Sequence, residues 1–204
     1  TLRGTPTHSS ADEIGMQDVP IARERIRDPV ENNIPGIGLG RDPERTPMQW
    51  NAEPNAGFST AEPWLPVAAD YPKVNVENER EEPRSLLMLY RRLIDLRRGE
   101  AALEVGGFEP VGATGDVLAY LRRAQDNRSI FLIALNFGST PQTLHRPAEA
   151  PPGTVEVSTY LDRDRERVTG DVYLRADEGI IARLDPQQGR KASRLNAPVF
   201  KLNT

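Results

Sequence analysis

The clearest periodic pattern of apolar residues lies in the middle of the chain. Between residues 83 and 98 the sequence reads PRSLLMLYRRLIDLRR, and its apolar side chains recur at intervals of three and four residues. This spacing places them on one face of a helix. Glu81 and Glu82 precede the stretch, and Arg97 and Arg98 close it. Because acids favour the positive N-terminal end of a helix and bases favour its C-terminal end, we predict a helix over 83–98.

Beyond Gly106 the apolar residues alternate with a period of two, which is typical of β-strands. Polar or glycine-containing segments separate the runs, as expected for antiparallel connections. The run IFLIAL at 130–135 is apolar throughout and therefore predicts a central strand. The predicted strands lie at 115–123, 129–137, 142–146, 154–161, 171–176 and 179–184. Regular short strands of this kind predict a small antiparallel β-sandwich over 105–184, with 185–204 as an unassigned tail.

Residues 1–78 show little periodicity and contain many prolines and glycines. A loop region of this length is uncommon inside a compact domain unless it is functional or packs on neighbouring structure. The chain also begins at Thr1, without an initiator methionine or a signal peptide. We therefore expect it to be the C-terminal part of a longer polypeptide, with its first residues wrapped on structure that precedes them.

The composition argues against several classes of function. The chain has 204 residues with 26 basic and 30 acidic side chains, and a net charge of −4 gives no electrostatic case for nucleic acid. The longest apolar run is far shorter than the roughly 20 residues needed to cross a bilayer. Cysteine is absent, which excludes disulfides and thiolate metal sites. We therefore expect no nucleic-acid partner, no membrane partner, no metal and no cofactor.

No familiar catalytic motif is found in the sequence. Adjacent Asp12 and Glu13 would point to opposite faces of a strand, so they make a poor pair of glycosidase carboxylates. Neither His8 nor His145 has a neighbour at metal-binding spacing. The segment GIGLG at 36–40 has neither a strand before it nor a helix after it, so a flexible turn explains it better than a phosphate loop. The residues therefore assign no catalytic group to the chain.

The segment GRDPERTPMQW at 40–50 holds the strongest candidate site. Arg41, Asp42 and Arg45 lie in a loop rich in glycine and proline, and such a loop can hold arginines at the rim of a pocket. A guanidinium offers a rigid fork of hydrogen-bond donors suited to carboxylates and to vicinal hydroxyls. The residues alone leave two alternatives open, a contact with a ligand and a buried structural ion pair.

Three aromatic residues are a second candidate for ligand binding. Trp50, Phe58 and Trp64 have flat apolar faces that can stack on sugar rings. Packing within the loops is the simpler explanation, and we prefer it.

Six blocks of the sequence together resemble a known family. In order they read TLRGTP, DEIGM, GRDPERTPMQW, NAGFS, PWLPV and SLLMLYRRLIDLRR. They resemble the C-terminal part of bacterial α-glucosidases of the α-amylase superfamily, glycoside hydrolase family 13, and the resemblance covers about residues 1–184. It implies that 1–104 form the end of a catalytic (β/α)8 barrel, with the eighth strand near 4–11, an active-site loop and the eighth helix. An antiparallel C-terminal domain would follow over 105–184.

The resemblance also implies a function. In this family the Asp nucleophile, the Glu general acid and a second catalytic Asp lie before this segment, so no catalytic residue is assigned to the chain. Arg41 with Asp42 resembles the pair that lines the subsite for the non-reducing-end glucose, and Arg45 resembles the arginine of the RTPMQW block. The implied reaction is hydrolysis of terminal α-linked glucose from maltose-like oligosaccharides or sucrose. The implied partners are that sugar substrate and a preceding barrel, in the cytoplasm.

Two other functions stay open. A glucosyl-transferring relative of the trehalose synthase or sucrose isomerase type shares the RTPMQW block. Alternatively, residues 106–184 could form a non-catalytic carbohydrate-binding module that uses Tyr120, Tyr160 or Tyr173 as exposed aromatics.

One departure from the family pattern lies in the expected eighth strand. Relatives usually read TPxxYYGDEIGM, whereas this chain reads TPTHSSADEIGM. Ser9, Ser10 and Ala11 thus replace two large aromatics and a glycine. Because truncating one buried aromatic side chain typically costs about 3 to 5 kcal/mol, we expect a weakened strand here.

Overall fold

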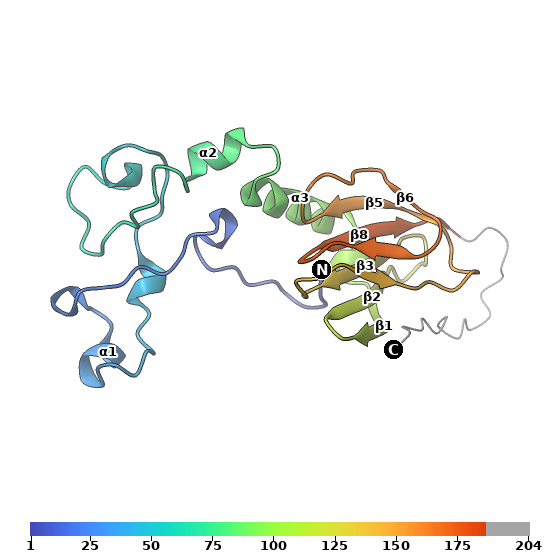
Figure 1. Ribbon diagram of the computed structural model, residues 1–204, viewed down its shortest axis with the longest axis horizontal. Coiled ribbons are helices and arrows are strands. Elements are labelled where there is room, and N and C mark those ends of the chain that lie inside the picture. The colour runs from blue at the N-terminus through green and yellow to red at the C-terminus, as the bar shows by residue number, and fades with distance from the viewer. Residues whose placement is uncertain (187–204) are drawn as a thin grey trace. The chain divides into compact units, whose positions relative to one another are not determined.

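A computed structural model describes residues 1–186 of the chain (Figure 1). The chain divides into two compact units, which we name the loop unit and the sheet unit. The loop unit comprises Thr7–Tyr90, and the sheet unit combines Thr1–Pro6 with the residues from Arg91 onward. None of the helices found in residues 1–186 has the length and apolar character that a membrane span requires. Most of the predicted tail, from residue 187 on, lies outside the described residues.

Short helices joined by loops make up the loop unit. Proline and glycine recur so often that longer helices cannot form, since proline lacks the amide that a helix interior needs. In chain order, with η marking a 3-10 helix, the elements are η1 (Asp12–Ile14), η2 (Arg23–Arg25), α1 (Pro29–Asn33), η3 (Asp42–Arg45), η4 (Pro54–Gly57), α2 (Val76–Glu81) and the start of α3 (Leu86–Gly99). One buried hydrophobic cluster consists of Ala11, Ile14, Val76 and Leu87, with Met16 and Met48 packed against it.

The helix predicted over 83–98 is confirmed as α3, although it begins at Leu86 rather than at Pro83. The hydroxyl of Ser85 accepts a hydrogen bond from the Met88 amide at 3.2 Å and so caps the helix. This cap explains the later start, because Ser85 takes the position at which the chain enters the helix.

Glu81 was expected at the start of that helix, but it ends the preceding helix α2. The polar sequence VENERE of α2 carries no apolar period, which is why the pattern did not reveal it. The side chain of Asn75 starts this helix by accepting a hydrogen bond from the Asn78 amide at 2.9 Å. The acids that precede α3 therefore belong to a separate element.

No strand is formed at residues 4–11 of the structure, and the barrel strand expected there stays a prediction. A barrel strand is held by hydrogen bonds to neighbouring strands, and residues 4–11 pair with none of the strands found in residues 1–186. The chain instead turns at Ala11, whose φ of 79° is left-handed, and continues into η1. A side chain makes this φ costly, whereas glycine adopts it without steric cost.

Antiparallel strands form the sheet unit. Six of them make one sheet in the order β1-β2-β3-β8-β5-β6, and β4 pairs separately with β7 (Figure 1). Their bounds are β1 (Gly107–Thr114), β2 (Val117–Arg123), β3 (Ile130–Asn136), β4 (Gln142–Leu144), β5 (Gly153–Ser158), β6 (Arg167–Val168), β7 (Val172–Leu174) and β8 (Gly179–Leu184).

All six strands predicted from alternation are present. The apolar run at 130–135 lies in β3, between β2 and β8, so the prediction of a central strand is confirmed. The pattern missed β6, which is very short, and β1. In β1 the register shifts between Pro110 and Gly112, and this irregularity interrupts the alternation. A proline is tolerated there because β1 is an edge strand.

Residues from both sheets share one hydrophobic core. The smaller sheet contributes Leu144, Val172 and Leu174, and the larger sheet contributes residues such as Leu132 and Ile180. The β4–β7 pair therefore packs on the larger sheet. A complete β-sandwich stays a prediction, because the second layer consists of two short strands in the described residues.

Two arginines hold the beginning of the chain within the sheet unit. Arg122 on β2 is fully buried and donates a hydrogen bond to the carbonyl of Thr1 at 2.5 Å. Arg97, near the end of α3, donates to the carbonyl of Gly4 at 2.6 Å. These bonds fix the backbone of the first residues without using their side chains.

Candidate functional site

The predicted site residues lie on and beside η3, which a buried carboxylate holds in place. Asp42 is 2% exposed, and its Oδ2 accepts hydrogen bonds from the amides of Arg27 at 2.5 Å and Asp28 at 2.8 Å. Its other oxygen, Oδ1, is buried and has no hydrogen-bond partner within the described residues. The Asp42 carboxylate therefore joins the segment at 27–28 to the segment that carries Arg41.

A second aspartate holds the same two segments from the opposite direction. Asp28 is 5% exposed, and its Oδ1 caps α1 by accepting a hydrogen bond from the Val30 amide at 2.8 Å. Its Oδ2 accepts a hydrogen bond from the Arg41 amide at 3.3 Å and lies 3.7 Å from Nη1 of Arg45. One carboxylate thus caps a helix, holds a backbone amide and faces a guanidinium.

The charge of Asp28 is fixed mainly by backbone hydrogen bonds. The Val30 amide lowers the pKa of Asp28 most, and the amides of Arg41 and Glu31 and the charge of Arg45 lower it further, against burial, which alone would raise it. Its net pKa therefore lies below the ordinary value. Asp28 is ionised at neutral pH and can attract the Arg45 guanidinium.

The three predicted residues have different surroundings. Asp42 is buried and engaged with the backbone, and Arg45 is half exposed and faces Asp28. Arg41 is exposed, and its guanidinium makes no hydrogen bond or ion pair within residues 1–186. Of the two alternatives that the sequence left open, Asp42 and Arg45 fit a structural arrangement, whereas Arg41 keeps its donors available for a ligand.

Asp28 is the residue that sequence reasoning missed. A signal was present, because the tripeptide Arg-Asp-Pro occurs at 27–29 and again at 41–43. The two copies hold each other through their aspartates, as the distances above describe. A repeat of only three residues is too short to predict a contact between its two copies from the sequence alone.

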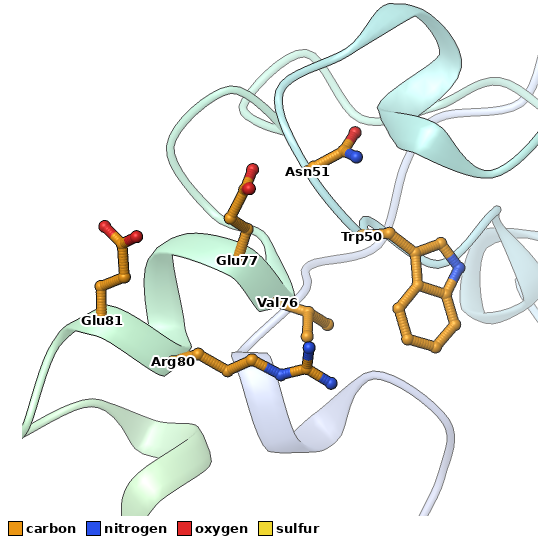
Figure 2. A pocket seen from close by; sticks show the side chains of 6 residues that line it. All are labelled: Trp50, Asn51, Val76, Glu77, Arg80 and Glu81. Carbon is orange, nitrogen blue, oxygen red and sulfur yellow. The ribbon is translucent and has the colours of Figure 1, made fainter.

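The larger cleft of the loop unit lies beside the end of the same segment. It has a volume of about 350 Å³ and is lined by Trp50, Asn51, Val76, Glu77, Arg80 and Glu81. In Figure 2 the Arg80 side chain extends past Val76 toward the Trp50 indole, while Glu77 and Asn51 project on the other side. Hydrogen bonds from the amides of Val76 to Gln49 and of Glu77 to Trp50, each 3.0 Å, join the segment to α2.

A second, smaller cleft of about 210 Å³ is lined by Ile21, Arg23, Ile26, Glu31, Asn32, Pro35 and Gly36. Arg41, Asp42 and Arg45 line neither of these clefts. The structure therefore brings the three residues together on one loop, outside both clefts.

The aromatic candidates are more exposed than loop packing requires. Trp50 and Phe58 are each 47% exposed and Trp64 is 57% exposed. Their rings present apolar area at the surface of the loop unit. Loop packing stays the preferred prediction for these three side chains, and about half of each is open to solvent.

The three candidate tyrosines of the sheet unit differ in how far their side chains are exposed. Tyr120 is fully buried, so the expectation that it is an exposed aromatic is wrong. Tyr160 and Tyr173 are exposed, but the guanidinium carbon of Arg175 lies 4.3 Å from the centre of the Tyr160 ring. One face of that ring is thus already occupied.

The histidines and glycines play local roles. His8 lies edge-on to the Tyr90 ring, with ring centres 5.5 Å apart, and His145 Nδ1 lies 2.7 Å from Asp171. No group of three or more potential metal ligands is found in the part of the chain that the structure describes. Gly36 and Gly38 have φ values of 81° and 73°, which agrees with the turn predicted at GIGLG.

Comparison with known proteins matches residues 1–106 to the catalytic domain of α-amylase. The glucan 1,6-α-glucosidase of Streptococcus pneumoniae serotype 4 is 35% identical over 160 residues, which cover 70% of this chain and 30% of the relative. The trehalose synthase/amylase of Mycobacterium tuberculosis is 38% identical over 154 residues, 71% of this chain and 23% of the relative.

A solved structure extends the likeness to most of the chain. The trehalulose synthase from Pseudomonas mesoacidophila matches with a TM-score of 0.75 and 26% identity, over 90% of this chain and 36% of that protein. The chain therefore spans about a third or less of the length of these relatives. Because the α-amylase catalytic domain matches more than half of its residues, the chain belongs to the α-amylase family, glycoside hydrolase family 13.

Proposed function

We propose that the chain is the C-terminal part of a retaining, exo-acting α-glucosidase that hydrolyses terminal α-linked glucose from maltose-like oligosaccharides or sucrose. The family, with glucosidases among its similar members, supports this activity. The observation that carries the proposal is the exposed guanidinium of Arg41, which has no hydrogen bond or ion pair to the residues that the structure describes. It projects from a loop whose backbone is held on both sides. Fixed donors of this kind suit the vicinal hydroxyls of a sugar.

In this proposal Arg41 donates hydrogen bonds to the terminal glucose. Arg45 lies close to the substrate, and Asp42 shapes the pocket through the loop that it braces. The nucleophile and the general acid come from the preceding barrel, so the chain alone is inactive. A cytoplasmic location stays a prediction.

The test is product analysis of the full-length enzyme that contains this chain. On maltose and sucrose it should release free glucose, and the anomeric configuration should be retained. The isolated chain should release none. Glucose release by the isolated chain, or an inverted product, would contradict the proposal.

The role of Arg41 has its own test in the full-length enzyme. Arg41→Ala removes charged hydrogen bonds worth about 1.5 to 3 kcal/mol, so KM for maltose should rise about 10- to 100-fold. Arg84→Ala removes an exposed arginine elsewhere in the loop unit and serves as the matched control. An unchanged KM in Arg41→Ala would remove Arg41 from the site.

A glucosyl-transferring enzyme is the second candidate. The similarity to a trehalose synthase/amylase and to a trehalulose synthase favours it. In such an enzyme the glucosyl group passes to a sugar rather than to water, so an isomeric disaccharide would accumulate. The same product analysis separates the two candidates, since free glucose alone supports the hydrolase.

A non-catalytic module on residues 106–184 is less well supported. It would rely on Tyr160 and Tyr173, because Tyr120 is buried. Calorimetric titration of the chain with maltooligosaccharides tests it, and no heat of binding would exclude it.

A further inference from the structure

Asp28 has no role in the function proposed above, yet it touches both arginines of the candidate site. We propose that Asp28 is a positioning residue for substrate binding, because it fixes the direction in which the Arg41 guanidinium meets the terminal glucose. This inference rests on the proposed role of Arg41. Asp28 itself is buried and acts through the backbone and through Arg45.

The backbone of Arg41 is held at both of its polar groups. Its amide donates to Asp28 Oδ2 at 3.3 Å, and its carbonyl accepts a hydrogen bond from the Glu44 amide at 3.2 Å. The residue has φ −98° and ψ 1° and lies immediately before η3. Asp28 supplies one of the two hydrogen bonds that hold its backbone.

Helix α1 adds a steric contact at the neighbouring position. A Cβ added at Gly40 would lie 2.8 Å from the Cβ of Glu31, so the backbone of Gly40 packs directly against this helix. Asp28 is the cap of α1 and therefore fixes the helix that abuts the residue before Arg41. The helix cap, the hydrogen bond from the Arg41 amide and the steric contact at Gly40 all fix the position of the backbone at residues 40–41.

Asp42 completes the arrangement from the other side. It holds the amides of Arg27 and Asp28, and so fixes the backbone from which the Asp28 side chain projects. Among residues 1–186, the Arg41 guanidinium has no partner, whereas the backbone that carries it is held by these hydrogen bonds. Because only its side-chain torsions remain to be ordered, less conformational entropy is lost when it binds a sugar.

Two substitutions separate positioning from folding. Asp28→Asn and Asp28→Ser both keep an oxygen that can cap α1, but neither keeps the second anionic oxygen for Arg41 and Arg45. In the full-length enzyme, each should raise KM for maltose about tenfold and change kcat by less than about twofold, because displacing a substrate contact weakens binding. Asp18→Asn, at an exposed position in the same unit, should change neither parameter.

A double variant tests whether the two residues act together. If Asp28 acts through Arg41, then Asp28→Asn combined with Arg41→Ala should raise KM no further than Arg41→Ala alone. Additive increases in KM would overturn the inference, since they would mean that Asp28 acts independently. A fall in kcat without a change in KM would also overturn it, because that result reports a loss of folded enzyme only.

Failure of this inference can be distinguished from failure of the proposed function. If Arg41→Ala raises KM and the Asp28 variants do not, only the positioning role is wrong. If Arg41→Ala leaves KM unchanged, the proposed role of Arg41 and the role of Asp28 are both wrong.

Amide hydrogen exchange in the unmodified protein provides a test that requires no variant to fold. The Arg41 amide should exchange at least about tenfold more slowly than an unbonded amide, as expected for a hydrogen-bonded group in a stable unit. Exchange at the unprotected rate would show that Asp28 does not hold Arg41, and would overturn the inference.

Discussion

Asp28 accepts a hydrogen bond from the backbone of the Arg41-Asp42 pair, and Asp42 accepts one from the backbone of the Arg27-Asp28 pair. Asp28 Oδ2 accepts from the Arg41 amide at 3.3 Å, and Asp42 Oδ2 accepts from the Asp28 amide at 2.8 Å. The reciprocal bonds hold together two segments that carry little regular structure of their own. In the absence of long helices, side-chain to backbone bonds of this kind give the loop unit its local order.

Asp42→Ala should destabilise the loop unit by about 1 to 3 kcal/mol, because it leaves the buried amide of Asp28 and the partly buried amide of Arg27 without an acceptor. Unfolding in urea can be followed by tryptophan fluorescence. The chain has two tryptophans, and both lie in the loop unit, so the signal reports that unit alone. Asp18→Ala removes an exposed carboxylate and should change the free energy of unfolding little. Equal effects of the two substitutions would show that Asp42 braces nothing.

Ala11→Gly should stabilise the loop unit. Ala11 has φ 79°, and a residue with a side chain loses about 1 kcal/mol in the left-handed region relative to glycine. Tryptophan fluorescence in urea should therefore show a gain of about that size. Ala22→Gly is the matched control, since Ala22 has φ −61° and gains no such relief. Destabilisation by Ala11→Gly would mean that the turn differs from the one described here.

The sequence predicted those elements whose apolar residues form a continuous run or a regular period. It identified β3, which is buried on both faces, and α3, whose apolar side chains form a stripe. It missed β1, where Pro110 breaks the alternation, and α2, which has a polar sequence. Periodicity reports burial, so elements held by caps or by an irregular register leave no such signal.

The candidate site was only partly predictable for a different reason. The motif around Arg41 can be recognised within eleven neighbouring residues, GRDPERTPMQW. The role of Asp28 depends on a contact between segments that are distant along the chain, and no local pattern encodes that contact. The barrel strand expected near 4–11 likewise depends on partner strands as well as on its own residues, so it stays a prediction.

Glu178 should make the sheet unit sensitive to acid. Its side chain is fully buried, and burial alone would raise its pKa. Hydrogen bonds from Arg175 and the charge of Arg163 outweigh burial and hold the pKa below its ordinary value of 4.5. A depressed pKa in the folded state stabilises the fold above the unfolded pKa, and this stabilisation is lost as the pH falls further. Thermal unfolding followed by far-ultraviolet circular dichroism should thus show a falling midpoint below about pH 4.5.

The substitution Glu178→Gln tests the cause of that sensitivity. At neutral pH it should destabilise the sheet unit by about 1 to 3 kcal/mol, because Arg163 and Arg175 lose their buried partner but keep Glu166 and Asp162. Its midpoint should also vary less with pH below 4.5 than that of the unmodified protein. Glu149→Gln, at an exposed site, should retain the original pH dependence. The same acid sensitivity in Glu178→Gln would assign it to other carboxylates.

Arg122→Met should destabilise the sheet unit because backbone carbonyls lose their hydrogen-bond donor, and not because an ion pair is lost. Its guanidinium donates to the carbonyls of Thr1, Gly106 and Gly107 at 2.5, 3.1 and 3.2 Å. Methionine fills much of the same volume but leaves these acceptors unsatisfied, at a cost of about 2 to 4 kcal/mol. Arg128→Met is the control, since that side chain is 88% exposed. Thermal unfolding followed by circular dichroism checks the difference between the two variants. Equal stability of the two would show that the bonds from Arg122 to the carbonyls contribute nothing.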